Sequence, residues 1–263
     1  MTEMIDRRRR QLLVGSAGAM AAMGMVGASP RAFAAEEKPF PQYVAWKEKD
    51  SLILHSAQTL EMKRGMAGPG VITPLQELFV RNNVPSPDES VVADRDAWEV
   101  SIQGTKNSRT MTVAELKSLG IETVATVLQC SGNGRAFFDH KASGTPWGVG
   151  AAGCVLWTGV PVRKVVEALG GIEKGAKFMT GTGGEELPQG LDPKSLMVER
   201  SVPLAAVENA LLVWEVNGQP LPLAHGGPLR LVVPGYYGVN NVKYIKQLAF
   251  TEQETDAKIQ SSG

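Results

Sequence analysis

Short runs of apolar and β-branched residues, broken by glycine and proline, follow one another along most of this chain. Residues 98–103 (WEVSIQ) alternate apolar and polar positions, which predicts a half-buried strand that ends at Gly104. Residues 121–129 (IETVATVLQ) form a β-branched run that predicts a second strand. This second strand would place Cys130 at its carboxyl end, where loops carry chemistry.

Two short helices are predicted among these strands. Thr112 and Glu115 have the spacing of a capping box, which predicts a helix that opens there and runs through Leu119. Residues 161–169 (PVRKVVEAL) predict a second helix, and Gly170-Gly171 provides its stop.

Two more buried strands are predicted near the end of the chain, at residues 210–216 and 229–234, with Asn217-Gly218 as a tight turn after the first. Many short strands with few short helices favour a mixed α+β domain over alternating βαβ units.

The N-terminus carries a different signal. The basic run Arg7–Arg10 precedes the apolar residues 12–26, and Ala32-Phe33-Ala34 is a small-x-small cleavage pattern. Two arginines, a spacer and two leucines at residues 9–13 predict a twin-arginine signal, with an ordinary secretory signal or a membrane anchor as alternatives. We therefore expect export to the periplasm by the twin-arginine route.

This signal sets the predicted domain organisation. Residues 1–35 form the signal, 36–70 an extended lead-in, 71–252 the catalytic domain and 253–263 a C-terminal tail.

Charge and composition narrow the function. Hydrophobic residues make up 43% of the chain, and 27 Lys and Arg balance 27 Asp and Glu, so the sequence is globular with no basic excess for nucleic acid. We expect a small anion held by a few arginines.

The two cysteines, Cys130 and Cys154, leave two interpretations open: a disulfide in an exported protein, or a thiolate ligand for a metal. The three histidines, His55, His140 and His225, have no spacing typical of a zinc site.

The loop after the predicted strand at 121–129 carries the strongest chemical signal. Its sequence LQCSGNGR surrounds Cys130 with small residues and places Arg135 five positions later. A nearby guanidinium favours thiolate over thiol, and thiolate is the form that binds soft metals.

This loop resembles the molybdenum-binding loop of the sulfite oxidase family, and further motifs of that family follow in matching order from about residue 70 to 250. The matching segments are LFVRNNVP (78–85), LQCSGNGR (128–135) with GTPW (144–147), VWEVNGQPLP (213–222), HGGPLR (225–230), and VVPG (232–235) with NVK (241–243).

The resemblance implies a molybdenum cofactor, molybdopterin, with Cys130 as the protein ligand of the metal. The family pattern implies that substrate-pocket roles fall on Arg81, Arg135 and Trp147. It also implies cofactor contacts at Phe79, Val80, Arg81, Asn82, Asn83, Glu185, His225, Arg230, Asn241, Val242 and Lys243. The implied activity is oxidation of sulfite, with electrons passed to an external acceptor such as cytochrome c.

Three departures from the family pattern bear on this interpretation. Val198 stands where the family has an active-site tyrosine, which Tyr236 or Tyr237 would have to replace in space. Asn83 replaces a histidine. The expected fold is the family's molybdopterin-binding domain without its C-terminal immunoglobulin-like domain.

Two alternative functions remain open. One is a single-domain molybdenum-dependent reductase of sulfoxides such as methionine sulfoxide, and the other is a non-catalytic exported domain with a Cys130–Cys154 disulfide.

Overall fold

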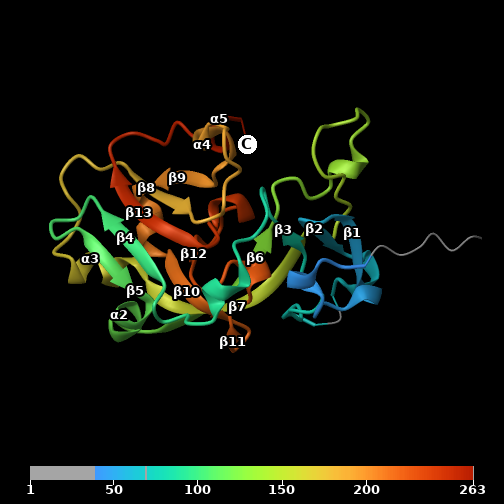
Figure 1. Ribbon diagram of the computed structural model, residues 1–263, viewed down its shortest axis with the longest axis horizontal. Helices are drawn as coiled ribbons and strands as arrows, with labels where there is room; N and C mark the ends of the chain where they lie inside the picture. The colour runs from blue at the N-terminus through green and yellow to red at the C-terminus, as the bar shows by residue number, and fades with distance from the viewer. Residues whose placement is uncertain (1–38, 69, 263) are drawn as a thin grey trace, which may run out of the picture. The chain divides into compact units, whose positions relative to one another are not determined.

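The computed structural model describes residues 39–68 and 70–262, and its strands form three sheets (Figure 1). The first sheet has the order β1-β2-β3, and its strands are β1 (Leu52–Ser56), β2 (Thr59–Met62) and β3 (Val80–Arg81). The second has the order β11-β10-β7-β6, with β12 also paired to β10, and comprises β6 (Glu122–Gln129), β7 (Ala152–Pro161), β10 (Leu211–Val216), β11 (Gln219–Pro220) and β12 (Arg230–Val232).

The third sheet has the order β5-β4-β13-β8-β9. Its strands are β4 (Glu99–Gln103), β5 (Arg109–Thr112), β8 (Phe178–Gly183), β9 (Glu199–Pro203) and β13 (Ile245–Thr251). The central pair β13–β4 is parallel and the other pairs are antiparallel, so the sheet is mixed. In Figure 1 this sheet lies at the left, β1 to β3 lie at the right, and the long strands β6 and β7 run between them.

The helices are short. The α-helices are α2 (Val113–Ser118), α3 (Val162–Ala168), α4 (Pro193–Leu196) and α5 (Lys258–Ser262). The 3-10 helices are η1 (Gln42–Val44), η2 (Lys49–Ser51), η3 (Arg64–Met66), η4 (Glu89–Val92), η5 (Arg135–Phe137), η6 (Leu204–Glu208), η7 (Leu223–His225) and η8 (Gly238–Asn240).

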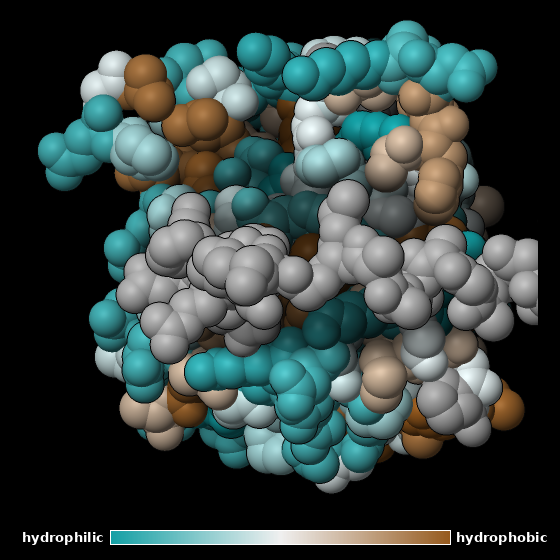
Figure 2. Space-filling model, turned by 90° about the vertical axis from the view of Figure 1, so that its right-hand side faces the viewer, coloured by the Kyte–Doolittle hydropathy of each residue, from teal (hydrophilic) through white to brown (hydrophobic). Residues whose placement is uncertain are grey.

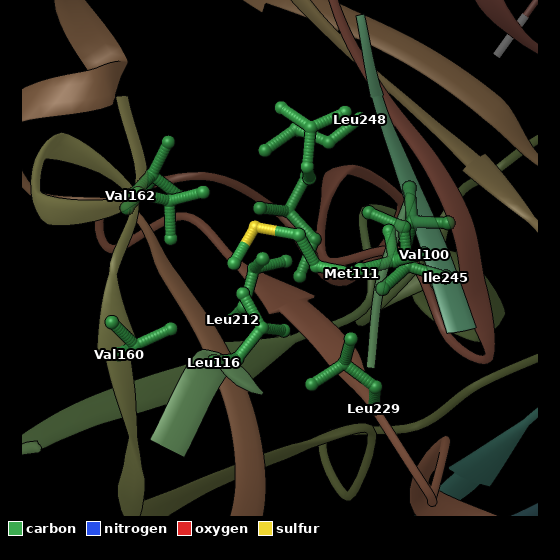
Figure 3. Close-up of a cluster of buried hydrophobic side chains, with 14 of the residues drawn as sticks. Val100, Met111, Leu116, Val160, Val162, Leu212, Leu229, Ile245 and Leu248 are labelled. Carbon is green, nitrogen blue, oxygen red and sulfur yellow. The ribbon is translucent and has the colours of Figure 1, made fainter. Parts of the chain in front are cut away.

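One large apolar cluster joins the second and third sheets (Figure 3). Val160 and Leu212 come from the second sheet, and Val100 and Leu248 come from the third. Met111 is buried with them. Each sheet thus buries one face against the other, which is how an α+β domain closes its core.

Several sequence predictions are confirmed. The α+β class is observed, and the strand predicted at 121–129 is β6, which ends one residue before Cys130. Thr112 and Glu115 form the predicted capping box at the start of α2, with reciprocal side-chain and backbone hydrogen bonds. The turn after β10 has positive φ at both Asn217 and Gly218, as a tight hairpin turn requires.

The lead-in segment differs from the sequence prediction. Residues 36–70 were expected to be extended, whereas β1 and β2 pair there as an antiparallel hairpin from Leu52 onward. The apolar positions Leu52, Leu60 and Met62 are buried in a small cluster with Val80 of β3. The hairpin is therefore stabilised by packing that its own short pattern does not reveal.

The predicted signal, residues 1–35, lies outside the described residues. Across residues 39–68 and 70–262, no helix is long and apolar enough to cross a membrane. Figure 2 views the molecule from the right-hand side of Figure 1. Outside the grey residues, hydrophilic and apolar residues are interspersed over this face.

Candidate functional site

A cavity of about 390 Å³ brings together most of the residues predicted for the site. Residues from strands, helices and the loops between them, drawn from positions 79 to 259, supply its walls. Its lining includes the predicted residues Phe79, Arg81, Asn82, Asn83, Cys130, Arg135, Trp147, Glu185, His225, Arg230, Asn241 and Lys243. Segments separated by more than 160 residues in sequence, such as Arg81 and Lys243, thus meet at one cavity.

Cys130 is positioned by backbone hydrogen bonds at the end of β6. Its N–H donates to the carbonyl of Ala151 at 2.9 Å, and its own carbonyl accepts from the N–H of Asn133 at 3.0 Å. The side-chain oxygen of Asn133 accepts from the N–H of Ala151 at 2.9 Å. The loop is therefore tied to the start of β7 by main-chain bonds, and the thiol itself is left to line the cavity.

Arg135 reaches the cavity through a gap that only glycines leave. A Cβ on Gly132 would lie 2.6 Å from its Nη1, and a Cβ on Gly144 would lie 2.8 Å from the same atom. Nη1 donates to the carbonyl of Thr145 at 3.0 Å, which fixes the guanidinium between the two segments. The small residues around Cys130 therefore serve to admit this cation.

Arg81 lies on the same side of the cavity and interacts electrostatically with both groups. Burial lowers the pKa of Arg81, the charge of Cys130 raises it, and the charge of Arg135 lowers it. Its guanidinium donates to the backbone carbonyl of Asn82. Arg81 thus interacts electrostatically with the Cys130 sulfur and with the guanidinium group of Arg135.

Trp147 is completely buried and forms part of the cavity wall. Its ring meets Phe79 edge to face at 6.1 Å and His55 at 5.3 Å. The Nε1–H of Trp147 is buried and has no hydrogen-bond partner within the described chain. Trp157 Nε1 is likewise unpaired, but Trp147 lines the cavity and Trp157 does not, so the indole of Trp147 is the one that a group bound in the cavity could meet.

A cluster of buried cations surrounds His225. The Nζ of Lys243 donates to Asn82 Oδ1 and to the carbonyl of Ala224, both at 2.6 Å. Arg230 donates to the carbonyls of His225 and Asn241 at 2.8 and 3.1 Å. The acceptors of these hydrogen bonds are neutral amide and carbonyl oxygens. Because none of them carries a formal negative charge, most of the positive charge of the cluster is uncompensated.

The pKa values of this cluster follow from burial and like charge. Burial lowers the pKa of Lys243 well below its usual value, and the charge of Arg230 lowers it further. Burial lowers the pKa of Arg230 to about 10. Burial also lowers the pKa of His225 strongly, followed by the charges of Lys47, Lys243 and Arg230, so the ring is neutral at pH 7.

Glu185 is the buried carboxyl group of the cavity. Burial raises its pKa to about 7, against the opposing effects of a hydrogen bond to its own backbone and the charge of Lys243. Its Oε2 is buried and has no hydrogen-bond partner among the described residues. A carboxyl group that is partly protonated near neutral pH can donate as well as accept.

Some predicted residues take other places. The side chains of Val80 and Val242 lie in hydrophobic clusters away from the cavity, so these two can contribute only backbone groups. The amide of Asn241 is engaged by backbone groups of Val233, Tyr236 and Tyr237.

Arg230 lines the cavity as predicted, but its Nε and Nη1 donate to backbone carbonyls, so a bound group would meet chiefly Nη2. Val198 lines the cavity, as its alignment predicted, whereas neither Tyr236 nor Tyr237 is among the lining residues. A spatial substitute for the family's tyrosine is therefore not found in this part of the chain.

The sequence interpretation missed several lining or supporting residues. Lys47 is buried beside His225 and comes from the segment interpreted as a lead-in, where a lone lysine carries no pattern. Lys258 and Ile259 line the cavity from α5, which lies in the segment interpreted as a tail. Only the long-range fold brings these residues to the site.

Both cysteines are free thiols, which argues against the disulfide alternative. Cys154 lies in β7 opposite Val127 and does not line the cavity. Within the described ranges, no three His, Cys, Asp or Glu side chains gather in a way that could hold a metal ion.

Comparison with known proteins identifies the domain. Residues 85–259 match the oxidoreductase molybdopterin binding domain. This chain belongs to that family, which includes sulfite oxidases. It is 29% identical over 204 residues to the mitochondrial sulfite oxidase of Drosophila melanogaster and 32% identical over 195 residues to the inducible nitrate reductase [NADH] 1 of Glycine max.

The matched regions cover 75% and 72% of this chain, and they span 34% of that sulfite oxidase and 22% of that nitrate reductase. The fold is similar to that of the sulfane dehydrogenase SoxCD from Paracoccus pantotrophus, with a TM-score of 0.67 at 20% identity, covering 91% of this chain and 59% of the other.

Membership implies a molybdenum cofactor held by the molybdopterin domain, and the cavity fits such a group. It offers one soft thiol, a set of uncompensated cations for an anionic group, and the orphan polar atoms of Trp147 and Glu185 for hydrogen bonds. These are the donor types that a metal dithiolene and a polar pterin require.

Proposed function

We propose that this chain is the catalytic domain of an exported enzyme that oxidises sulfite to sulfate. The reaction consumes one sulfite and one water and yields one sulfate, two protons and two electrons. We further propose that the electrons pass to an external cytochrome c-type acceptor, and that the predicted twin-arginine signal directs the protein to the periplasm.

Cys130 is proposed as the single protein ligand of molybdenum. When bound, the cofactor supplies a two-electron redox centre at this thiol. Asn82, His225 and Lys243 are proposed to hold the pterin and its phosphate, together with Phe79, Asn83, Glu185, Arg230 and the backbone around Asn241. Phe79, Asn82, His225 and Arg230 are buried, so the hydrogen bonds and charge of this part of the set act at low dielectric.

Arg81, Arg135 and Trp147 are proposed as the substrate-binding residues. The observation that carries this proposal is that Arg81 and Arg135 line the same cavity as Cys130, and Arg81 interacts electrostatically with both of the other groups. Sulfite is a small dianion at neutral pH, and paired guanidinium groups offset the cost of taking it out of water. Trp147 closes the wall with an indole N–H that can donate to a substrate oxygen.

The test is a substrate comparison on purified protein with a measured molybdenum content. Sulfite should reduce ferricyanide or cytochrome c rapidly. Failure of sulfite to reduce either acceptor in molybdenum-loaded protein would overturn the proposal.

Nitrate reduction is a second candidate, because the chain is 32% identical to the nitrate reductase of Glycine max and 29% identical to the sulfite oxidase, over similar lengths. Nitrate is also a small oxyanion that suits an arginine-lined pocket. Oxidation of a reduced dye by nitrate, with sulfite inert, would favour this candidate. The same dye assay with methionine sulfoxide tests the sulfoxide reductase alternative.

A further inference from the structure

Lys47 is a buried lysine, and no carboxylate of the described residues forms an ion pair with it. Its Nζ lies 2.5 Å from the carbonyl oxygen of Leu75, 2.6 Å from that of Leu78 and 2.7 Å from Nε2 of His225. The side chain is almost completely buried. These three contacts leave little freedom in how the protons are arranged.

The two carbonyl oxygens can only accept, so Nζ must donate to both of them. An ammonium group has a third N–H, which then points at Nε2 of His225 and makes this nitrogen an acceptor. The neutral ring must in that case carry its proton on Nδ1. A neutral amine would have only two N–H groups, and its lone pair would have to accept a proton from Nε2 instead.

We propose that Lys47 is a positioning residue that fixes His225 as the Nδ1–H tautomer, so that the ring offers the cofactor cavity a hydrogen-bond donor. The proposal rests on the binding of molybdopterin in this cavity and does not depend on which substrate the enzyme uses. Because Nε2 is committed to Lys47, Nδ1–H is the ring group that can donate. A bound group would compete for it with the carbonyl of Leu75, which also contacts the ring.

The surroundings of the pair favour this arrangement. The two carbonyl oxygens stabilise the ammonium form of Lys47 and oppose the effect of burial, which lowers its pKa. The groups that act on His225 are Lys47, Lys243 and Arg230, together with a hydrogen bond to the Leu75 backbone. A neutral donor among these cations suits a cofactor rich in oxygen acceptors, whereas a bare ring nitrogen would repel them.

The tautomer can be read directly from protein prepared without cofactor. The chain has three histidines, so a long-range ¹H–¹⁵N spectrum of histidine-labelled protein resolves each ring, and His225→Gln identifies the signals of interest. We expect a protonated Nδ1 and an unprotonated, hydrogen-bonded Nε2. A proton on Nε2 overturns the proposal, whatever the enzyme oxidises.

Lys47→Met removes the donor and keeps the length of the side chain, and exposed Lys49→Met is the matched control. In Lys47→Met the fixed tautomer should give way to a mixture, and the pterin content of purified protein should fall at least about tenfold. Lys49→Met should change neither. A Lys47→Met protein with the wild-type tautomer and full pterin content overturns the proposal, and if that variant does not fold, the wild-type spectrum decides.

Discussion

Cys130 is the residue on whose sulfur the chemistry depends, and its position is fixed mainly by the backbone, with its side chain packed against one apolar cluster. Backbone hydrogen bonds to Ala151 and Asn133 hold the loop, so the thiol is available to a ligand. Cys154, the other free thiol, lies away from the cavity.

Replacing Cys130 with serine therefore separates ligand chemistry from folding. We expect Cys130→Ser to abolish turnover and to lose molybdenum, because a serine hydroxyl is a poor donor for a soft metal. The free energy of unfolding should change by less than about 1 kcal/mol, since the backbone anchors remain. Metal analysis and denaturant unfolding check both points, with Cys154→Ser as the control that keeps its metal.

Glu185 makes stability depend on pH. Its pKa is raised from 4.5 to about 7, so the folded protein binds more protons than the unfolded chain between these values. Stability should therefore fall as pH rises from about 4.5 to about 7 and level off above, by up to about 3 kcal/mol.

Glu185→Gln removes this titration and keeps the shape of the side chain. The unfolding free energy of wild type and variant is to be measured from pH 4.5 to 8. As pH rises, the wild type should lose stability relative to the variant. A difference that stays constant across this range contradicts the raised pKa. Asp88 is fully exposed, so the pKa of its carboxyl group is not raised above its usual value by burial. Asp88→Asn therefore serves as the control.

Site residues that lie within a local sequence motif could be predicted from the sequence, whereas site residues outside any motif could not. Cys130 and Arg135 lie in one loop with glycines spaced to admit the guanidinium, so a motif reveals them. Lys47 gains its role only from contacts with Leu75 and His225, the latter 178 positions away. Burial of a single lysine leaves no periodic trace.

The same limit applies to secondary-structure elements. The strand β6 was predicted because its sequence is a β-branched run, and α2 because of its capping box. The adjacent strand β7 contains Gly153 and Gly159, which weaken a strand pattern, and it is stabilised by pairing with both β6 and β10. Pairing between distant segments is not encoded in either segment alone.

Gly159 is required by the close approach of β7 to β10. A Cβ there would lie 2.1 Å from the carbonyl oxygen of Leu212 and 2.5 Å from the Cα of Val213, both backbone atoms. Gly159→Ala should therefore destabilise the protein by about 2–3 kcal/mol in denaturant unfolding. Gly65→Ala, where a Cβ meets nothing within 4 Å, is the control, and equal midpoints for the two variants would rule this explanation out.

At the scale of the whole molecule, two sheets and the segment between β8 and β9 contribute to one cavity whose charge is unlike that of the chain. The chain has no net formal charge, with 27 residues of each sign. The cavity instead collects Arg81, Arg135, Arg230 and Lys243, with Glu185 as its buried acid. Repulsion among these cations therefore destabilises the folded protein, and an anion that binds in the cavity should relieve this repulsion and raise the stability.

This charge imbalance predicts that oxyanions stabilise the protein prepared without cofactor. Phosphate binds only the folded cavity, so it should raise the melting temperature by a few degrees relative to chloride at equal ionic strength. Salt also affects the melting temperature of any folded protein in a general way. The informative quantity is therefore how much smaller the phosphate-induced rise in melting temperature is in Lys243→Met, which removes one cation of the cavity. Equal increments in wild type and variant would show that phosphate acts elsewhere. A larger increment in wild type would locate the anion at the end of the cavity where Lys243 and Arg230 flank His225, and competition between phosphate and molybdopterin would follow.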